Sequence, residues 1–125
     1  MGPDAIAPDG SEIYRLVDDS LRASMVEVRL GAGLVSRPVR HRTVEEIWYV
    51  TGGRAKVWRS APGDPVGETV TVRPGDAVRI PTRWAFQFAA APETGLRFVC
   101  FTSPPWPGPG EAELLESGGL GRPTA

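Results

Sequence analysis

Residues 40–53 read RHRTVEEIWYVTGG and contain the only histidine of the chain, His41, together with a glutamate pair, Glu45 and Glu46. The part from 44 to 50 is rich in β-branched and aromatic residues, which favour a strand. A histidine and a glutamate that converge inside a β-structure can bind a metal ion or transfer a proton. We therefore expect this segment to carry the chemistry of the protein, with Glu45 as a solvated neighbour of the pair.

Strand patterns of similar length recur on both sides of this segment, separated by turns. Residues 24–30 alternate between the two faces of a strand. Gly52 and Gly53 predict a tight hairpin turn, and residues 73–76, RPGD, place proline and glycine where a type II turn requires them. The predicted strands are residues 13–17, 24–30, 44–50, 55–59, 68–72, 77–80, 85–89 and 96–102.

These patterns predict an all-β fold, an antiparallel sandwich or barrel, because short strands recur and no long helical pattern is present. The 15 glycines and 13 prolines suit the many turns of such a fold. A length of 125 residues allows a single domain, with a barrel core over about residues 12–102. We expect a flexible N-terminal arm over residues 1–11, one or two helical turns around 111–116, and a flexible C-terminal tail beyond Ser117.

Charge and composition exclude several classes of partner. The 14 basic and 15 acidic residues nearly balance, and no basic patch stands out, so we expect no nucleic-acid partner. The N-terminus lacks the features of a signal peptide, and no apolar run reaches membrane-spanning length. We therefore expect a cytoplasmic protein without a membrane partner. The single cysteine, Cys100, has apolar neighbours, which predicts a buried and unreactive thiol.

Two motifs in the sequence resemble those of the cupin family. His41, Glu46 and Gly53 have the spacing of the second half of the first cupin motif, and Gly75 and Pro81 have that of the start of the second. The resemblance covers roughly residues 24–102 and implies a double-stranded β-helix, or jelly roll. Residues 103–108, SPPWPG, also resemble a subgroup of small single-domain bacterial cupins.

The chain departs from the family pattern at its metal ligands. Metal-binding cupins hold the ion with three histidines and one glutamate, and this sequence keeps only His41 and Glu46 of those four. The missing histidines fall on Val39 and Phe86. The second motif also has Arg83 in place of a glycine. Because catalytic metals take about three protein ligands, the resemblance implies a degenerate site, and we predict no cofactor.

Strand alternation predicts what the barrel interior contains. Trp48 shares the inward face of Glu46, and an inward Phe86 brings Trp84 and Phe88 with it. A buried Glu46 requires a partner, which we expect to be His41, with Arg29 or Arg79 as a second. The residues expected to bind the substrate are Val39, Trp48, Trp84, Phe86, Phe88, Arg29 and Arg79.

An aromatic pocket with one imidazole and one carboxylate suits an apolar or aromatic small molecule. An imidazole can take and give a proton near neutral pH, so we predict catalytic roles for His41 and Glu46. The predicted activity is that of a metal-independent isomerase or cyclase, in a setting such as secondary metabolism. A structural interpretation also stays open, in which the same side chains only fill and hold the core. These side chains are His41, Glu46, Trp48, Trp84, Phe86 and Phe88.

Two alternatives stay open from the sequence. One is a metal-dependent dioxygenase or isomerase in which His41, Glu46 and a non-standard ligand such as Gln87 hold Fe, Mn, Ni or Zn, although alternation turns Gln87 away from the barrel axis. The other is a binding or sensing module without chemistry. Because cupins commonly pair through their sheets, the resemblance also implies a homodimer, in which Trp58 and Trp106 cover the barrel or contact the second copy.

Overall fold

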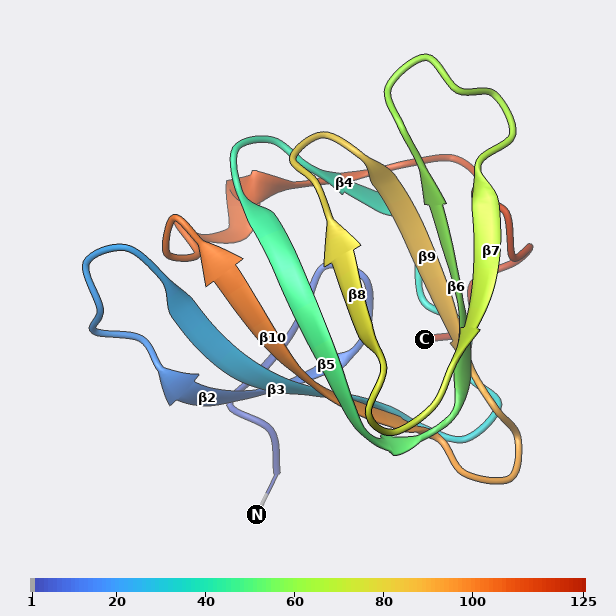
Figure 1. Ribbon diagram of the computed structural model, residues 1–125, viewed down its shortest axis with the longest axis horizontal. Coiled ribbons are helices and arrows are strands. Elements are labelled where there is room, and N and C mark those ends of the chain that lie inside the picture. Colours follow the sequence, from blue (N-terminus) through green and yellow to red (C-terminus); the bar gives the residue numbers. More distant parts are fainter. Residues whose placement is uncertain (1) are drawn as a thin grey trace.

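In the computed structural model, residues 2–125 form eleven strands in two antiparallel sheets that face each other (Figure 1). The first sheet has the order β1-β2-β3-β10-β5-β8. Its strands are β1 (Ala5–Ile6), β2 (Glu12–Val17), β3 (Ser24–Leu30), β10 (Leu96–Ser103), β5 (Glu45–Gly53) and β8 (Ala77–Ile80). The second sheet has the order β11-β4-β9-β6-β7. Its strands are β11 (Ala112–Leu114), β4 (Val39–His41), β9 (Ala85–Ala90), β6 (Ala55–Ser60) and β7 (Glu68–Val72).

The predicted all-β fold is confirmed, and all eight predicted strands are present with ends shifted by no more than a few residues. The two predicted turns are formed by glycines in conformations that other residues rarely adopt. Gly53 ends β5 with a φ of 73°, and Gly75 has a φ of 96° in the turn before β8. This turn is closed by the Asp76 amide, which donates to the carbonyl of Arg73 at 3.0 Å.

The core lies between the two sheets and follows from the alternation of apolar residues along the strands. In β3, Val28 and Leu30 are buried while Arg29 is exposed. On β10, Phe98 and Cys100 point inward, and they pair with β5 positions whose side chains also do so. Cys100 is buried as predicted, and burial raises the pKa of its thiol well above the usual range.

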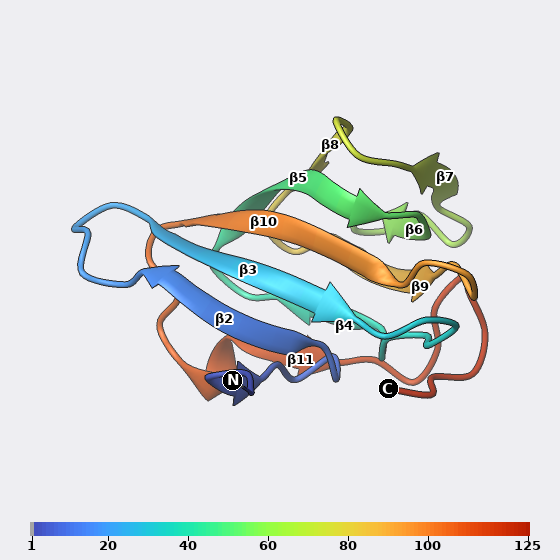
Figure 2. The ribbon, with the colours of Figure 1, turned by 90° about the horizontal axis from the view of Figure 1, so that it is seen from below.

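The N-terminal arm differs from the flexible segment expected from sequence. Residues 5–6 form β1, which pairs with β2, and the arm folds back along the edge of the first sheet (Figure 2). The Asp4 and Ala7 amides donate to the carbonyls of Ile13 and Ser11, at 2.8 and 2.9 Å. The Arg37 amide donates to the carbonyl of Asp9 at 2.8 Å. The arm is therefore tied to β2 and to the segment that precedes β4, while Met1, also part of that prediction, lies outside the described residues.

The C-terminal tail also differs from the prediction. Residues predicted to be helical instead form a short 3₁₀ turn, Pro109–Glu111, followed by β11. Beyond Ser117 the tail runs along the outer face of the second sheet, where the Gln87 side chain binds it. The Gln87 amide nitrogen donates to the carbonyl of Gly121 at 2.9 Å, and its oxygen accepts from the Leu120 amide at 2.8 Å. Thr124 then bonds to the backbone of Val35.

Helices contribute little to this structure. Over residues 2–125 there is no helix of the length and apolar character that a membrane crossing requires. The architecture therefore depends on the two sheets and on the segments that close their open edge.

Candidate functional site

A cavity of about 540 Å³ opens between the two sheets at the edge where the N-terminal arm and β11 lie. Side chains from β2, β3, β5 and β10 form one wall, and β4 and β9 form the other. The N-terminal arm and the segment from Pro105 to Ala112 cover it. Its volume lies in the range of ligand sites in proteins, and most of its surface is apolar.

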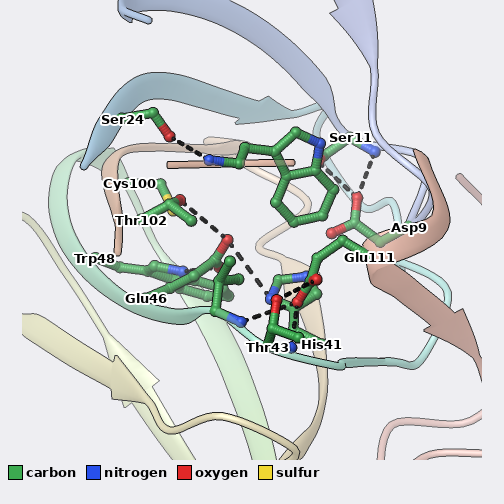
Figure 3. Close-up of polar contacts among 12 residues, drawn as sticks. Asp9, Ser11, Ser24, His41, Thr43, Glu46, Trp48, Cys100, Thr102 and Glu111 are labelled. Carbon is green, nitrogen blue, oxygen red and sulfur yellow. Dashed lines mark hydrogen bonds and ion pairs between the residues drawn. The ribbon is translucent and has the colours of Figure 1, made fainter. Parts of the chain in front are cut away.

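His41 and Glu46 both line this cavity and approach each other across it (Figure 3). Their side-chain Nδ1 and Oε2 atoms are 3.7 Å apart. His41 is 6% exposed and Glu46 is 7% exposed, so the pair is shielded from bulk water. The Nδ1 atom is buried without a hydrogen-bond partner in the described part of the chain. Because 3.7 Å exceeds the length of a normal hydrogen bond, the two side chains lie close together without a hydrogen bond between them.

The Glu46 carboxylate is held by its neighbours on the strands. The Trp48 indole donates to Oε1 at 2.9 Å, and the Thr102 hydroxyl lies 3.5 Å from Oε2. Thr102 pairs directly with Glu46 across β10 and β5. These contacts compensate part of the cost of burying a carboxylate and leave Oε2 facing His41.

Aromatic side chains fix the plane of the His41 ring. Phe86 and Trp106 each meet it edge-on, with ring centroids 5.1 Å away. Trp48 stacks on Phe98 at 4.2 Å and continues the aromatic wall. Val39, Trp48 and Phe86 line the cavity, as the alternation of strand residues predicted. The sequence prediction gave Trp106 as a residue that covers the barrel or contacts a second copy, and it did not foresee the contact with the imidazole.

Glu111 holds the loop that follows His41, a role the sequence prediction did not foresee. Its carboxylate accepts hydrogen bonds from the Thr43 amide and hydroxyl, both at 2.6 Å, and from the Val44 amide at 2.9 Å. Burial opposes ionisation of this carboxylate, but these donors outweigh it, so the pKa of Glu111 is lowered from 4.5. Glu111 therefore anchors the segment between the two candidate catalytic residues.

Arg29 and Arg79 do not lie in the cavity, and this prediction is corrected by the structure. Arg29 is exposed, pairs with Glu27 at 2.5 Å and lies over the ring of Tyr14. Arg79 is exposed on β8. Both residues alternate with buried apolar residues along their strands, so their side chains point to the outer face of the sheet. Glu46 is held by Thr102 and Trp48 instead of by an arginine.

Trp84 and Phe88 also lie outside the cavity. Phe88 is fully buried behind it, where its ring packs against those of Trp48 and Phe98. Trp84 is partly exposed, and its ring lies 5.3 Å from the guanidinium of Arg59. For these two residues the packing interpretation describes the structure better than a substrate contact.

The donor set considered for a metal does not come together. Gln87 lies on the outer face of β9, where its amide bonds to the backbone of Ser36 and of the tail. Over residues 2–125 no three His, Cys, Asp or Glu side chains are grouped as a metal site requires. His41 and Glu46 alone fall short of the three protein ligands that catalytic metals normally take.

Another carboxylate that lines the cavity comes from the N-terminal arm. Asp9 lines the cavity, and its Oδ1 atom accepts hydrogen bonds from the amide and hydroxyl of Ser11. Sequence analysis missed Asp9 because the arm carries no strand alternation that could place it. The only signal was the DGS triplet, Asp9-Gly10-Ser11, which is typical of a tight turn.

Comparison with solved structures shows which folds resemble this one. KdgF from Halomonas sp. is 22% identical with a TM-score of 0.69, over 83% of this chain and 86% of its own. The polyketide cyclase RemF from Streptomyces resistomycificus is 20% identical with a TM-score of 0.72, over 92% and 79%. Pumpkin pro-11S globulin is 19% identical with a TM-score of 0.72, over 85% of this chain and 29% of its own.

This chain therefore spans less than a third of the seed globulin. At these identities the likeness shows the fold alone. No curated protein matches the chain. The family model described as Cupin matches residues 15–106, which include strands β3 to β10 and the His41–Glu46 pair. The protein belongs to the cupin family.

Proposed function

We propose that the protein is a metal-independent isomerase or cyclase that moves a proton on an apolar or aromatic metabolite. One observation carries the proposal: His41 and Glu46 form a buried pair, 3.7 Å apart, at the wall of an aromatic cavity. Support also comes from the similarity to RemF, a polyketide cyclase, and to KdgF, which are small cupins of comparable length.

The pair can act as a proton carrier because each residue has a separate task. Glu46 faces Nδ1 and favours the tautomer in which that nitrogen carries the proton. The Nε2 atom then has a free lone pair and serves as the base. Glu46 stabilises the imidazolium that forms when Nε2 takes a proton, and the same group returns that proton to another atom of the substrate. Hydrogen bonds of this kind shorten when a ligand binds.

Proton exchange on a simple ketone tests this role without knowledge of the natural substrate. The probe is 2-tetralone, an apolar bicyclic ketone with acidic C–H bonds, in deuterated buffer containing a chelator. We expect the wild-type protein to accelerate exchange and the His41→Ala variant to lose about a hundred-fold or more of that acceleration. Glu46→Gln should also lose most of it, whereas Glu45→Gln, a change at the exposed neighbour, should not.

Other outcomes would support the two alternative functions. Exchange that requires added Fe, Mn, Ni or Zn and disappears with chelator would indicate a metal-dependent enzyme. Tight binding of the ketone without any exchange would indicate a binding or sensing module. Undiminished exchange in His41→Ala would contradict the proposal.

We also propose that the protein is a homodimer that pairs through the outer face of the first sheet. Three large apolar side chains are exposed there: Ile47 (47%), Tyr49 (53%) and Phe101 (40%). Phe101 pairs with Ile47 across β10 and β5, and Val99 pairs with Tyr49, so they form one continuous strip. A contiguous apolar surface of this kind is typical of an interaction site, and the same surface on a second copy would cover it.

A further inference from the structure

The arm brings one group to the cavity that the proposed proton transfer does not use. Asp9 reaches the site from the N-terminal arm, whereas Glu46 reaches it from β5 (Figure 3). The Asp9 backbone is fixed by the Arg37 amide, and Oδ1 accepts from the Ser11 amide at 2.9 Å and from its hydroxyl at 2.6 Å. Within residues 2–125 no donor contacts the second oxygen, Oδ2. This carboxylate is therefore held in place with one acceptor atom free.

The charges around the cavity determine which polar groups a ligand can carry. Burial raises the pKa of Asp9, the Ser11 hydrogen bonds oppose that rise, Glu46 adds to it and His41 opposes it. Asp9 thus shares one electrostatic environment with the His41–Glu46 pair. Among the described residues that line the cavity, Arg15 is the single arginine or lysine, and it is exposed. An anionic ligand group would meet the carboxylates of Asp9 and Glu46, and no buried lysine or arginine lines the described cavity to offset their charge.

We propose that Asp9 selects the ligand: its Oδ2 atom accepts a hydrogen bond from a hydroxyl group of a flat aromatic molecule. This inference rests on the proposed function, because it takes the His41–Glu46 cavity as the substrate site. It names the substrate class as neutral hydroxylated aromatics, of phenol or enol type, in preference to aromatic acids. Phe86 and Trp106 supply the apolar walls for the ring, and Asp9 supplies the polar anchor at the arm.

The test measures binding of three probes that share one ring system. These are 2-naphthol, naphthalene and 2-naphthoate, and the measurement is equilibrium dialysis against the full chain near neutral pH. We expect wild-type protein to bind 2-naphthol about ten- to a hundred-fold more tightly than naphthalene, the usual gain from a hydrogen bond to a charged group. Naphthoate should bind more weakly than naphthalene.

Variants at Asp9 separate anchoring from a structural role of the arm. Asp9→Asn keeps an acceptor for Ser11 but loses the negative charge. The preference for naphthol over naphthalene should therefore fall by about tenfold, and naphthoate should bind this variant more tightly than it binds the wild-type protein. Naphthalene binding should stay the same. The control Asp4→Asn changes a carboxylate of the same arm that does not line the cavity, and it should keep the preference for naphthol.

Two results would overturn the inference and leave the proposed function standing. One is binding of naphthalene with no preference for naphthol in the wild-type protein. The other is an equal loss of all three probes in Asp9→Asn, which would make Asp9 a structural residue of the arm. If none of the three probes binds the wild-type protein, the cavity is not an aromatic site, and the proposed function fails together with this inference.

Discussion

Glu111 shows how one buried carboxylate can position a site from outside it. It satisfies two backbone amides and one hydroxyl in the loop after His41. Glu111→Gln places an amide where those donors need an oxygen, and we expect it to lower the free energy of unfolding by about 1–3 kcal/mol at neutral pH. Chemical denaturation measures this change. An unchanged denaturation midpoint would show that the loop does not depend on these bonds.

The pH dependence of the same variant follows from the lowered pKa of Glu111. A carboxyl group with a folded-state pKa below its ordinary value of 4.5 stabilises the fold above that pH. This contribution is lost as the pH falls through the folded-state pKa. The difference between wild type and Glu111→Gln should therefore shrink as the pH is lowered below about 4.5. A difference that stays constant would contradict the assignment.

Asp9 is expected to have the opposite pH dependence. Burial is the main cause that raises its pKa above 3.8, so its charged form is disfavoured in the folded protein. Its contribution to stability is fully present below pH 3.8 and is lost as the pH rises through the folded-state pKa. Asp9→Asn should thus be at least as stable as wild type at neutral pH, and its advantage should disappear at low pH. Thermal unfolding across this range measures it, and destabilisation at neutral pH would contradict the prediction.

Among the secondary-structure elements, β9 holds the C-terminal tail through one side chain. Gln87 is the one polar residue in the sequence of β9, AFQFAA, and it bonds to Ser36, Leu120 and Gly121. In Gln87→Leu, which keeps the approximate volume, the backbone of the tail loses these partners. We expect hydrogen exchange of residues 118–125 to quicken by about tenfold or more, with little change in β5 and β10. Equal protection of the tail in both proteins would show that Gln87 does not hold it.

The strands show which elements a sequence can predict. Residues 24–30 and 96–102 alternate in register with the core, so their local pattern and their tertiary environment agree. The segment from 109 to 114 has no such pattern. It forms a turn and β11 because β4 offers a free edge, where Ala112 pairs with His41. That partner is distant in sequence, so no local signal predicts the strand.

The backbone at Arg83 shows that a motif position can keep its conformation after the residue has changed. The second cupin motif has a glycine at this place, and Arg83 has a φ of 69°, which is unusual for a residue with a side chain. Its amide donates to the carbonyl of His41 at 3.0 Å. The turn therefore helps to place the candidate base, although the residue at the motif's glycine position has changed.

For the molecule as a whole, the sequence predicted one side of the site better than the other. His41, Glu46, Trp48 and Phe86 lie on strands or at their ends, where spacing and alternation determine direction. Asp9, Trp106 and Glu111 come from segments that close the open edge between the sheets. Their positions depend on how the chain termini pack against the barrel, which no periodic pattern encodes.

The exposed strip on the first sheet leads to a prediction about assembly. If two copies pair through Ile47, Tyr49 and Phe101, a charge introduced within this strip would be buried in the interface without a partner. We expect Ile47→Glu to reduce the particle mass measured by light scattering from that of a dimer to that of a monomer. The control is Val70→Glu, a charge at an exposed apolar position of β7, outside the strip, which should leave the mass unchanged.

The two variants together separate assembly from folding. Ile47→Glu and Val70→Glu each add one negative charge at an exposed strand position, so a general loss of stability would affect both variants alike. A dimer interface predicts instead that only Ile47→Glu changes the mass, while both variants keep the circular dichroism of the wild-type protein. Because the strip lies on the outer face and the cavity opens on the inner one, probe binding should be equal in monomer and dimer. A wild-type protein that is monomeric at high concentration would refute the pairing.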